Sequence, residues 1–169
     1  MHRPLLAALA AFFALAPASL AGPAAPSVPG EIAVPAGHKP FLVGHATGVQ
    51  IYACDGAAWR LVAPRATLTG DNGKVIATHG AGPHWTARDG STVIGRRDAG
   101  VSGGAGAIDW LRLAVVSATP GDDGDRLAHT SYIQRINTTG GVAPAGSCAD
   151  GARAEIPYTA DYVFFKATE

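Results

Sequence analysis

The residues best suited to chemistry lie in one short segment, His79-Gly-Ala-Gly-Pro-His84-Trp85, with Asp89 four residues further on. Neutral imidazole nitrogens and carboxylate oxygens are ordinary ligands of divalent metal ions. His79, His84 and Asp89 therefore form a candidate divalent-metal site, although two histidines without a clear third ligand are a weak signature for zinc. No other cofactor is predicted.

The same segment also suits a small organic ligand. The Trp85 indole can stack on a sugar ring while the two histidines and Asp89 bond its hydroxyl groups, because concave binding sites combine apolar surface with a few polar groups. A structural interpretation stands beside this one. Gly82-Pro83 then forms a turn, Trp85 packs in the core, and the Asp89 carboxylate caps backbone N–H groups of a hairpin turn.

Other polar residues lie beside or within strand-like runs. His45 and His129 could join His79 in space and form a metal or acid–base site. A further group is expected to hold strands together, because arginine pairs well with carboxylates. Binding of a carboxylate or a sugar is the alternative for this group, which consists of Asp109, Arg112, Gln134 and Arg135.

The chain lacks the sequence signatures of several enzyme classes. The chain has no GxSxG elbow and no phosphate loop, and Gly104-Ala-Gly106 is followed by Asp109 in place of a third glycine. Basic and acidic residues number 13 each, which argues against nucleic acid as a partner. We therefore favour a non-enzymatic domain that binds a carbohydrate or another envelope or extracellular ligand. The alternatives are a metal-dependent or hydrolytic enzyme and a structural surface protein without a small ligand.

The N-terminal residues predict export. A basic start at His2-Arg3, an apolar run from Leu5 to Leu15 and small residues at Ser19 and Ala21 have the pattern of a signal peptide over residues 1–21. The proline-rich residues 22–31 are expected to be a linker, and residues 32–169 a β domain. The apolar run is too short to span a bilayer and no later segment is long enough, so the protein is expected to be secreted or periplasmic.

The two cysteines, Cys54 and Cys148, are expected to form a disulfide, because an even cysteine count in an exported protein favours pairing. Two free buried thiols are the alternative. The absence of a CxxC spacing argues against a metal site that uses both.

Short β-prone runs separated by turn signals predict an all-β fold, a single-domain sandwich or barrel of about nine antiparallel strands. The clearest hairpin turns at Asp71-Asn-Gly73, because Asn-Gly readily adopts positive φ. In the final run, Tyr158, Tyr162 and Phe164 share one face.

Five strings occur in a specific order: Gly48-Val-Gln-Ile-Tyr-x-Cys54, His79-x-x-Gly-Pro-x-Trp85 with Asp89-Gly-Ser91, Asp109-Trp-Leu-Arg-Leu113, Tyr132-Ile-Gln-Arg-Ile-Asn-Thr138 with Gly140-Gly141, and Pro157-Tyr-Thr-Ala-Asp-Tyr162. In these strings the chain resembles an exported family known as domain of unknown function 3455, over residues 32–166. The resemblance implies an exported β-rich domain. It supplies no catalytic residues, and the oligomeric state stays open.

Overall fold

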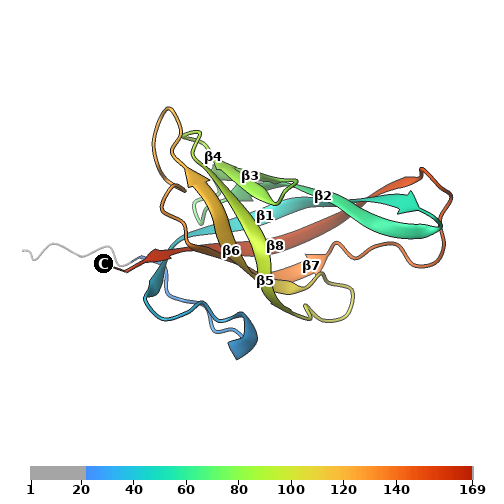
Figure 1. Cartoon of the computed structure of the whole chain (residues 1–169), viewed down its shortest axis with the longest axis horizontal. Coiled ribbons are helices and arrows are strands. Elements are labelled where there is room, and N and C mark those ends of the chain that lie inside the picture. The colour runs from blue at the N-terminus through green and yellow to red at the C-terminus, as the bar shows by residue number, and fades with distance from the viewer. Residues whose placement is uncertain (1–21, 169) are drawn as a thin grey trace, which may run out of the picture.

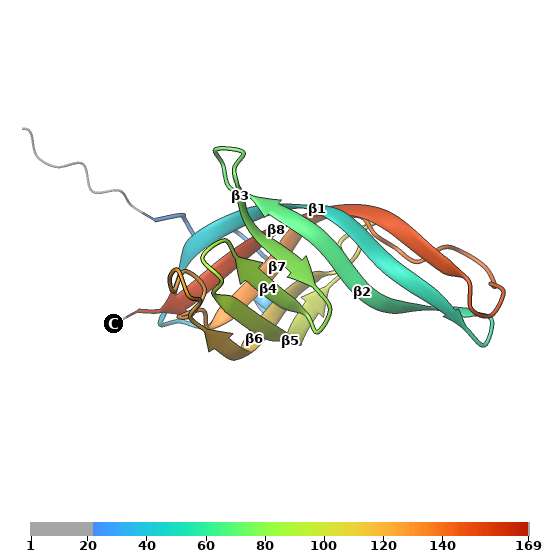
Figure 2. The same cartoon turned by 90° about the horizontal axis from the view of Figure 1, so that it is seen from above.

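Eight antiparallel strands form one closed barrel in the computed structural model, which describes residues 22–168 (Figure 1; Figure 2). The predicted signal peptide, residues 1–21, lies outside the described residues. Within residues 22–168 no helix is both long and apolar enough to cross a membrane. The strands are β1 (His38–Asp55), β2 (Ala58–Thr69), β3 (Val75–Gly80), β4 (His84–Ala87), β5 (Thr92–Val101), β6 (Trp110–Thr119), β7 (Tyr132–Gly140) and β8 (Arg153–Ala167).

Each strand pairs with the next along the chain, and β8 returns to pair with β1. The turns follow the local sequence. Gly56 and Ala57 both have positive φ in the β1–β2 turn, and Gly73 has φ 72° in the β2–β3 turn. The side chain of Asn72 accepts a hydrogen bond from the Lys74 backbone N–H at 3.0 Å in that second turn. The Asn-Gly hairpin predicted from sequence is therefore confirmed.

The all-β barrel expected from sequence is confirmed, with eight strands where about nine were expected. The count is lower because two pairs of β-prone runs are each one continuous strand. Residues 40–43 and 48–54 both belong to β1, and residues 58–62 and 66–69 both belong to β2. Gly48 allows this in β1, since a Cβ there would collide with the backbone of β2. Pro64 is tolerated in β2 because β3 pairs only with Ala66–Thr69, which leaves the proline on a free edge.

Alternating side chains fill the barrel from inside. The face of β8 predicted to carry Tyr158, Tyr162 and Phe164 points into the core, and all three side chains are buried. Leu127, in the loop between β6 and β7, is fully buried in the same cluster. The Asp89 carboxylate accepts hydrogen bonds from Ser91 and from the Arg126 backbone N–H, so it helps to hold this loop in place.

A second apolar cluster lies where the N-terminal segment covers the outside of the barrel. Ile32, in a short 3-10 helix (Gly30–Ile32), packs with Ile136, Val163 and Phe165. Gln134 donates a hydrogen bond to the Ile32 carbonyl at 2.7 Å, and Arg112 donates one to the carbonyl of Ala33. Val28 also packs against this cluster, so part of the expected linker, residues 22–31, contacts the domain.

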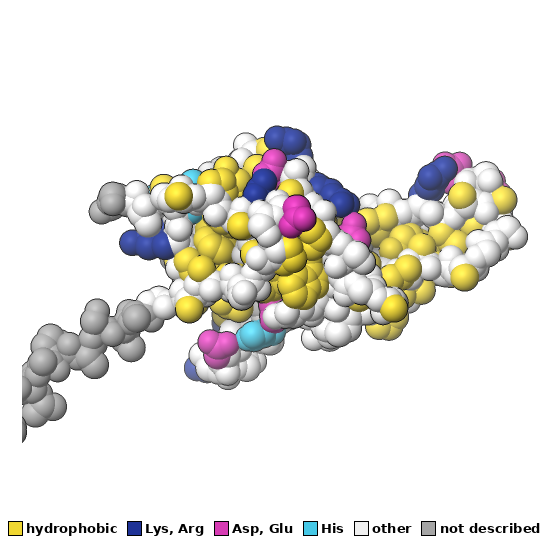
Figure 3. Space-filling model, turned by 90° about the horizontal axis from the view of Figure 1, so that it is seen from below, with side chains coloured by type: hydrophobic (Ala, Val, Ile, Leu, Met, Phe, Trp, Pro, Cys, Tyr) yellow, Lys and Arg dark blue, Asp and Glu magenta, His cyan; other side chains and the backbone are white. Residues whose placement is uncertain are grey.

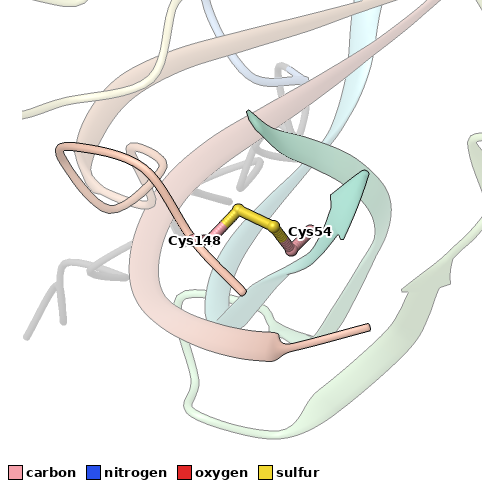
Figure 4. Close-up of a disulfide and its surroundings, with 2 residues drawn as sticks. All are labelled: Cys54 and Cys148. Atoms are coloured by element: carbon pink, nitrogen blue, oxygen red, sulfur yellow. A yellow bond between two sulfur atoms is a disulfide. The ribbon is translucent and has the colours of Figure 1, made fainter. Parts of the chain in front are cut away.

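Strands β1, β2 and β8 extend beyond the barrel as a long projection (Figure 1; Figure 2). Towards the tip of this projection the expected disulfide joins Cys54, near the end of β1, to Cys148 in the loop that precedes β8 (Figure 4). The bridge connects residues 94 apart in sequence, so it removes much of the conformational freedom of the unfolded chain.

Replacing both cysteines, Cys54→Ser with Cys148→Ser, should lower the free energy of unfolding by about 2–4 kcal/mol, because the unfolded chain regains its loop entropy. Urea denaturation of the two proteins measures the difference. Adding a thiol reductant should lower the stability of the wild-type protein alone. Equal stability of variant and wild type without reductant would show that the bridge does not contribute.

Candidate ligand-binding site

All eight strands contribute side chains to one cavity of about 390 Å³ at the end of the barrel beside the projection. The strand contributions show that this cavity is the open part of the barrel lumen, and we call it the lumen cavity. Its volume lies at the lower end of the range usual for small-ligand pockets. The lining residues are Gln50, Leu61, Val62, Ala63, Pro64, His79, Gly82, Pro83, Trp85, Arg97, Leu111, Leu113, Arg135 and Tyr162.

Two of the residues singled out from sequence, His79 and Trp85, line this cavity together. Their rings stack with centroids 4.3 Å apart and planes 6° apart, and Tyr162 contacts both rings edge-on. Trp85 is only 1 % exposed, and His79 covers one of its faces. A sugar ring therefore cannot stack on that face of Trp85.

The other two predicted residues lie apart from the cavity lining. The imidazole of His84 hydrogen-bonds to the Ala81 carbonyl in its own turn. Asp89 makes the turn and loop contacts described above, which hold its pKa below the usual value, mainly through the Ser91 side chain. Residues 22–168 contain no cluster of three or more His, Cys, Asp or Glu side chains that could hold a metal ion, so His79, His84 and Asp89 are not gathered into one.

The two additional histidines do not join His79. His45 lies between Asp161, 2.7 Å from its Nδ1, and Asp71, 2.9 Å from its Nε2. The hydrogen bond to Asp71 and then that to Asp161 raise the pKa of His45 above its usual value. His129 pairs at 3.3 Å with Asp125. Neither histidine lines the lumen cavity.

Two residues that line the cavity, Gln50 and Trp85, have buried polar atoms without partners among the described residues. Gln50 is 2 % exposed, yet neither its Nε2 nor its Oε1 has a hydrogen-bond partner among the described residues. The Trp85 indole N–H is buried and unpaired as well. Gly141 packs beside the Gln50 side chain, where an added Cβ would press on it. Buried unpaired groups are rare and costly, so they point to a ligand or water that completes them.

Positive charge faces the cavity, and among the described residues only Arg97 has an acidic partner, Asp109, at 3.2 Å. Arg97 and Arg135 line it, and no Asp or Glu does. Burial lowers the pKa of His79 to about 4, so its imidazole is neutral at pH 7. Burial also raises the pKa of Tyr158 and Tyr162, which keeps both phenols neutral. The lumen therefore carries a net positive charge.

A family model described as "Protein of unknown function (DUF3455)" matches residues 35–166, which is most of the chain. The chain belongs to this family. No curated protein and no solved structure matches it. The resemblance predicted from the five sequence strings is therefore confirmed, and the cavity of this DUF3455 domain must be interpreted from its own chemistry.

Sequence reasoning missed Gln50 and Arg97 as site residues and left the role of Arg135 open. A signal for Gln50 was present: it shares a strand face with Tyr52 and Cys54, both buried, and a buried glutamine needs partners. Arg135 alternates in the same way with the core residue Ile133. Arg112 and Gln134, which were expected to hold strands together, instead donate hydrogen bonds to the N-terminal segment. Arg112 also pairs with Asp98 on the neighbouring strand β5.

Gln50 and Gln134 offer a matched pair of buried glutamines. Gln50→Met should raise the free energy of unfolding of the ligand-free protein by about 1 kcal/mol, because it removes two buried unpaired atoms. Gln134→Met should lower it by about 1–3 kcal/mol, because it leaves the Ile32 carbonyl without its donor. Chemical denaturation measures both values. If Gln50→Met is as destabilising as Gln134→Met, Gln50 has a structural role.

The buried His79 predicts a pH dependence of stability. The pKa of His79 is about 4 in the folded protein, below its ordinary 6.5, so the unfolded chain binds more protons between these values. The contribution of His79 to the free energy of unfolding is fully present above pH 6.5. It should fall by about 2–3 kcal/mol as the pH drops towards 4. Because the pKa of His45 is raised, His45 changes the stability only above pH 6.5, outside this window.

Urea denaturation of the wild-type protein at a series of pH values measures this slope. His79→Gln should flatten it, and His129→Gln, at an exposed site, should leave it unchanged. A slope that survives in His79→Gln would contradict the assignment.

Proposed function

We propose that this DUF3455 domain is an exported binding protein that holds a small amphipathic molecule in the lumen cavity. The strongest support is the Gln50 side chain, whose two amide atoms are buried and unpaired and which lines a cavity to which every strand contributes. A barrel built only as a scaffold has no need to leave polar atoms unpaired in its lumen. A ligand with a polar group at Gln50 supplies the missing hydrogen bonds.

The walls indicate an apolar body for this ligand. Leu61, Val62 and Pro64 line the cavity from the projecting part of β2, and Leu111 and Leu113 line it from β6. Leu61 is 56 % and Val62 49 % exposed, so β2 presents an apolar rim to solvent. Figure 3 shows hydrophobic side chains at the surface both over the barrel and along the projection. Burial of an apolar ligand against this rim would be favourable.

A carbohydrate, one of the ligand classes expected from sequence, is less well supported. Sugar recognition uses an open aromatic face, and the stacked His79 closes one face of Trp85. The apolar rim also leaves much of a sugar's hydroxyl shell without partners. Export is supported by the disulfide, which is typical of proteins in oxidising compartments.

A cavity-filling substitution tests this function. The uncharged fluorescent probe N-phenylnaphthylamine should bind the purified wild-type protein with increased emission, because the lumen is apolar and shielded. Ala63→Phe places a ring in the cavity from β2 and should weaken binding about tenfold or more. Neutral sugars should not displace the probe.

Val116→Phe is the matched control, since Val116 is 58 % exposed and does not line the cavity. Its affinity for the probe should equal that of the wild-type protein. Equal affinity of wild type and Ala63→Phe, with both proteins folded, would place the probe elsewhere and contradict the proposal.

A further inference from the structure

Arg135 is a cation without a counter-ion in the barrel lumen. Its Nε and Nη2 donate hydrogen bonds to the neutral Asp109 backbone carbonyl, at 3.0 and 2.9 Å. No carboxylate among the described residues forms an ion pair with it. Arg112 differs, because its Nε lies 2.7 Å from Asp98. A half-buried charge without an opposite charge is unfavourable, and this one lines a cavity that a ligand can enter.

The neighbours of Arg135 cannot supply the negative charge. Its positive charge lowers the pKa of His79 and opposes the upward shifts of Tyr52, Tyr158 and Tyr162, so it acts on all four side chains. These side chains are nevertheless neutral at pH 7, because burial disfavours their charged forms. Arg97, the other cation of the lining, already pairs at 3.2 Å with Asp109 at the rim.

The unpaired amide of Gln50 adds a hydrogen-bond donor to the same cavity. Its Nε2 carries two N–H groups, neither of which has a partner, and the Trp85 indole N–H is a further unpaired donor. A guanidinium and neutral N–H donors together suit an acceptor that carries one negative charge. A carboxylate matches this set, whereas a phosphate with close to two charges would remain partly uncompensated by Arg135 alone.

We propose that the ligand is a small carboxylate with an apolar body, whose head group is held by Arg135 and Gln50 while its body lies against the apolar rim of β2. This inference rests on the proposed function and names the chemical class of the ligand. The volume of about 390 Å³ fits a medium-chain or single-ring carboxylate in the lumen.

Three molecules with the same chain and different heads test this inference: decanoate, decanol and decylamine, each used below its micelle-forming concentration. Each competes with bound N-phenylnaphthylamine on the wild-type protein at neutral pH. Decanoate should displace the probe about tenfold more strongly than decanol, and decylamine should be the weakest, because the lumen is positive. This comparison needs no variant, so it does not depend on the folding of one.

Variants then test whether Arg135 causes the preference for decanoate over decanol. In Arg135→Gln the ratio of decanoate to decanol affinity should fall close to one, and in Arg135→Lys a preference for decanoate should remain. A ratio cancels any general change in the cavity. Arg96→Gln is the matched control, since Arg96 neighbours Arg97 in β5 but does not line the cavity, and it should keep the wild-type ratio.

The outcomes separate the two proposals. If the probe binds the lumen but decanoate and decanol compete equally, the carboxylate inference is overturned and the proposed function stands. Calorimetry measures decanoate binding directly. If neither the probe nor decanoate binds, both the proposed function and the carboxylate inference are overturned. If Arg135→Gln keeps the full preference for decanoate, Arg135 does not hold the head group.

Discussion

Strand β8 pairs with β1 from His38 opposite Ala167 to Ala53 opposite Arg153, and this pairing closes the sheet. Closure satisfies the backbone hydrogen bonds of both strands and gives the barrel an inside, which alternating side chains must fill. Side chains fill the lumen completely at the end where Phe164 and Leu127 are buried. It is incomplete at the other end, where β1, β2 and β8 run on into the projection and the lumen cavity remains open.

Closure of the barrel places buried polar groups both outside the sheet and in the lumen. Outside the barrel, Gln134 and Arg112 are paired with the N-terminal segment, so they fix that segment to the sheet. Inside the lumen, Gln50 has no partner and Arg135 has no counter-ion among the residues described. Buried unpaired atoms also occur outside the lumen, at Gln134 Oε1 and at the Trp110 indole N–H. Gln50 differs from Gln134 because both of its amide atoms are unpaired and its side chain lines a cavity.

Much of the architecture was predictable from sequence, since local signals decide it. The Asn72-Gly73 turn, the pairing of Cys54 with Cys148 and the inward face of β8 all follow from residue type and alternation. Pro157 lies on a sheet edge, where proline is tolerated, because β7 reaches only as far as Tyr158 opposite Gly140. The structure has eight strands where about nine were expected, because Gly48 and Pro64 resemble strand breaks in the sequence but the neighbouring strands accommodate both.

The site was less predictable, because alternation identifies a face of a strand and not the depth to which that face is packed. Gln50 and Arg135 are far apart in sequence, and only barrel closure directs both into one lumen. Conversely, His79, His84 and Asp89 are close in sequence, yet only His79 lines the cavity. His45 could not be placed at all, since its partners Asp71 and Asp161 come from the β2–β3 turn and from β8.

In the proposed complex, a ligand completes the polar groups of the lumen. Nitrogen NMR of the side-chain amides during a titration with decanoate tests it most directly, because Gln50 and Gln134 are both buried and serve as probe and internal reference. The Gln50 amide resonances should shift with a saturable dependence on decanoate while those of Gln134 stay in place. An unchanged Gln50 signal at concentrations that saturate binding would contradict it.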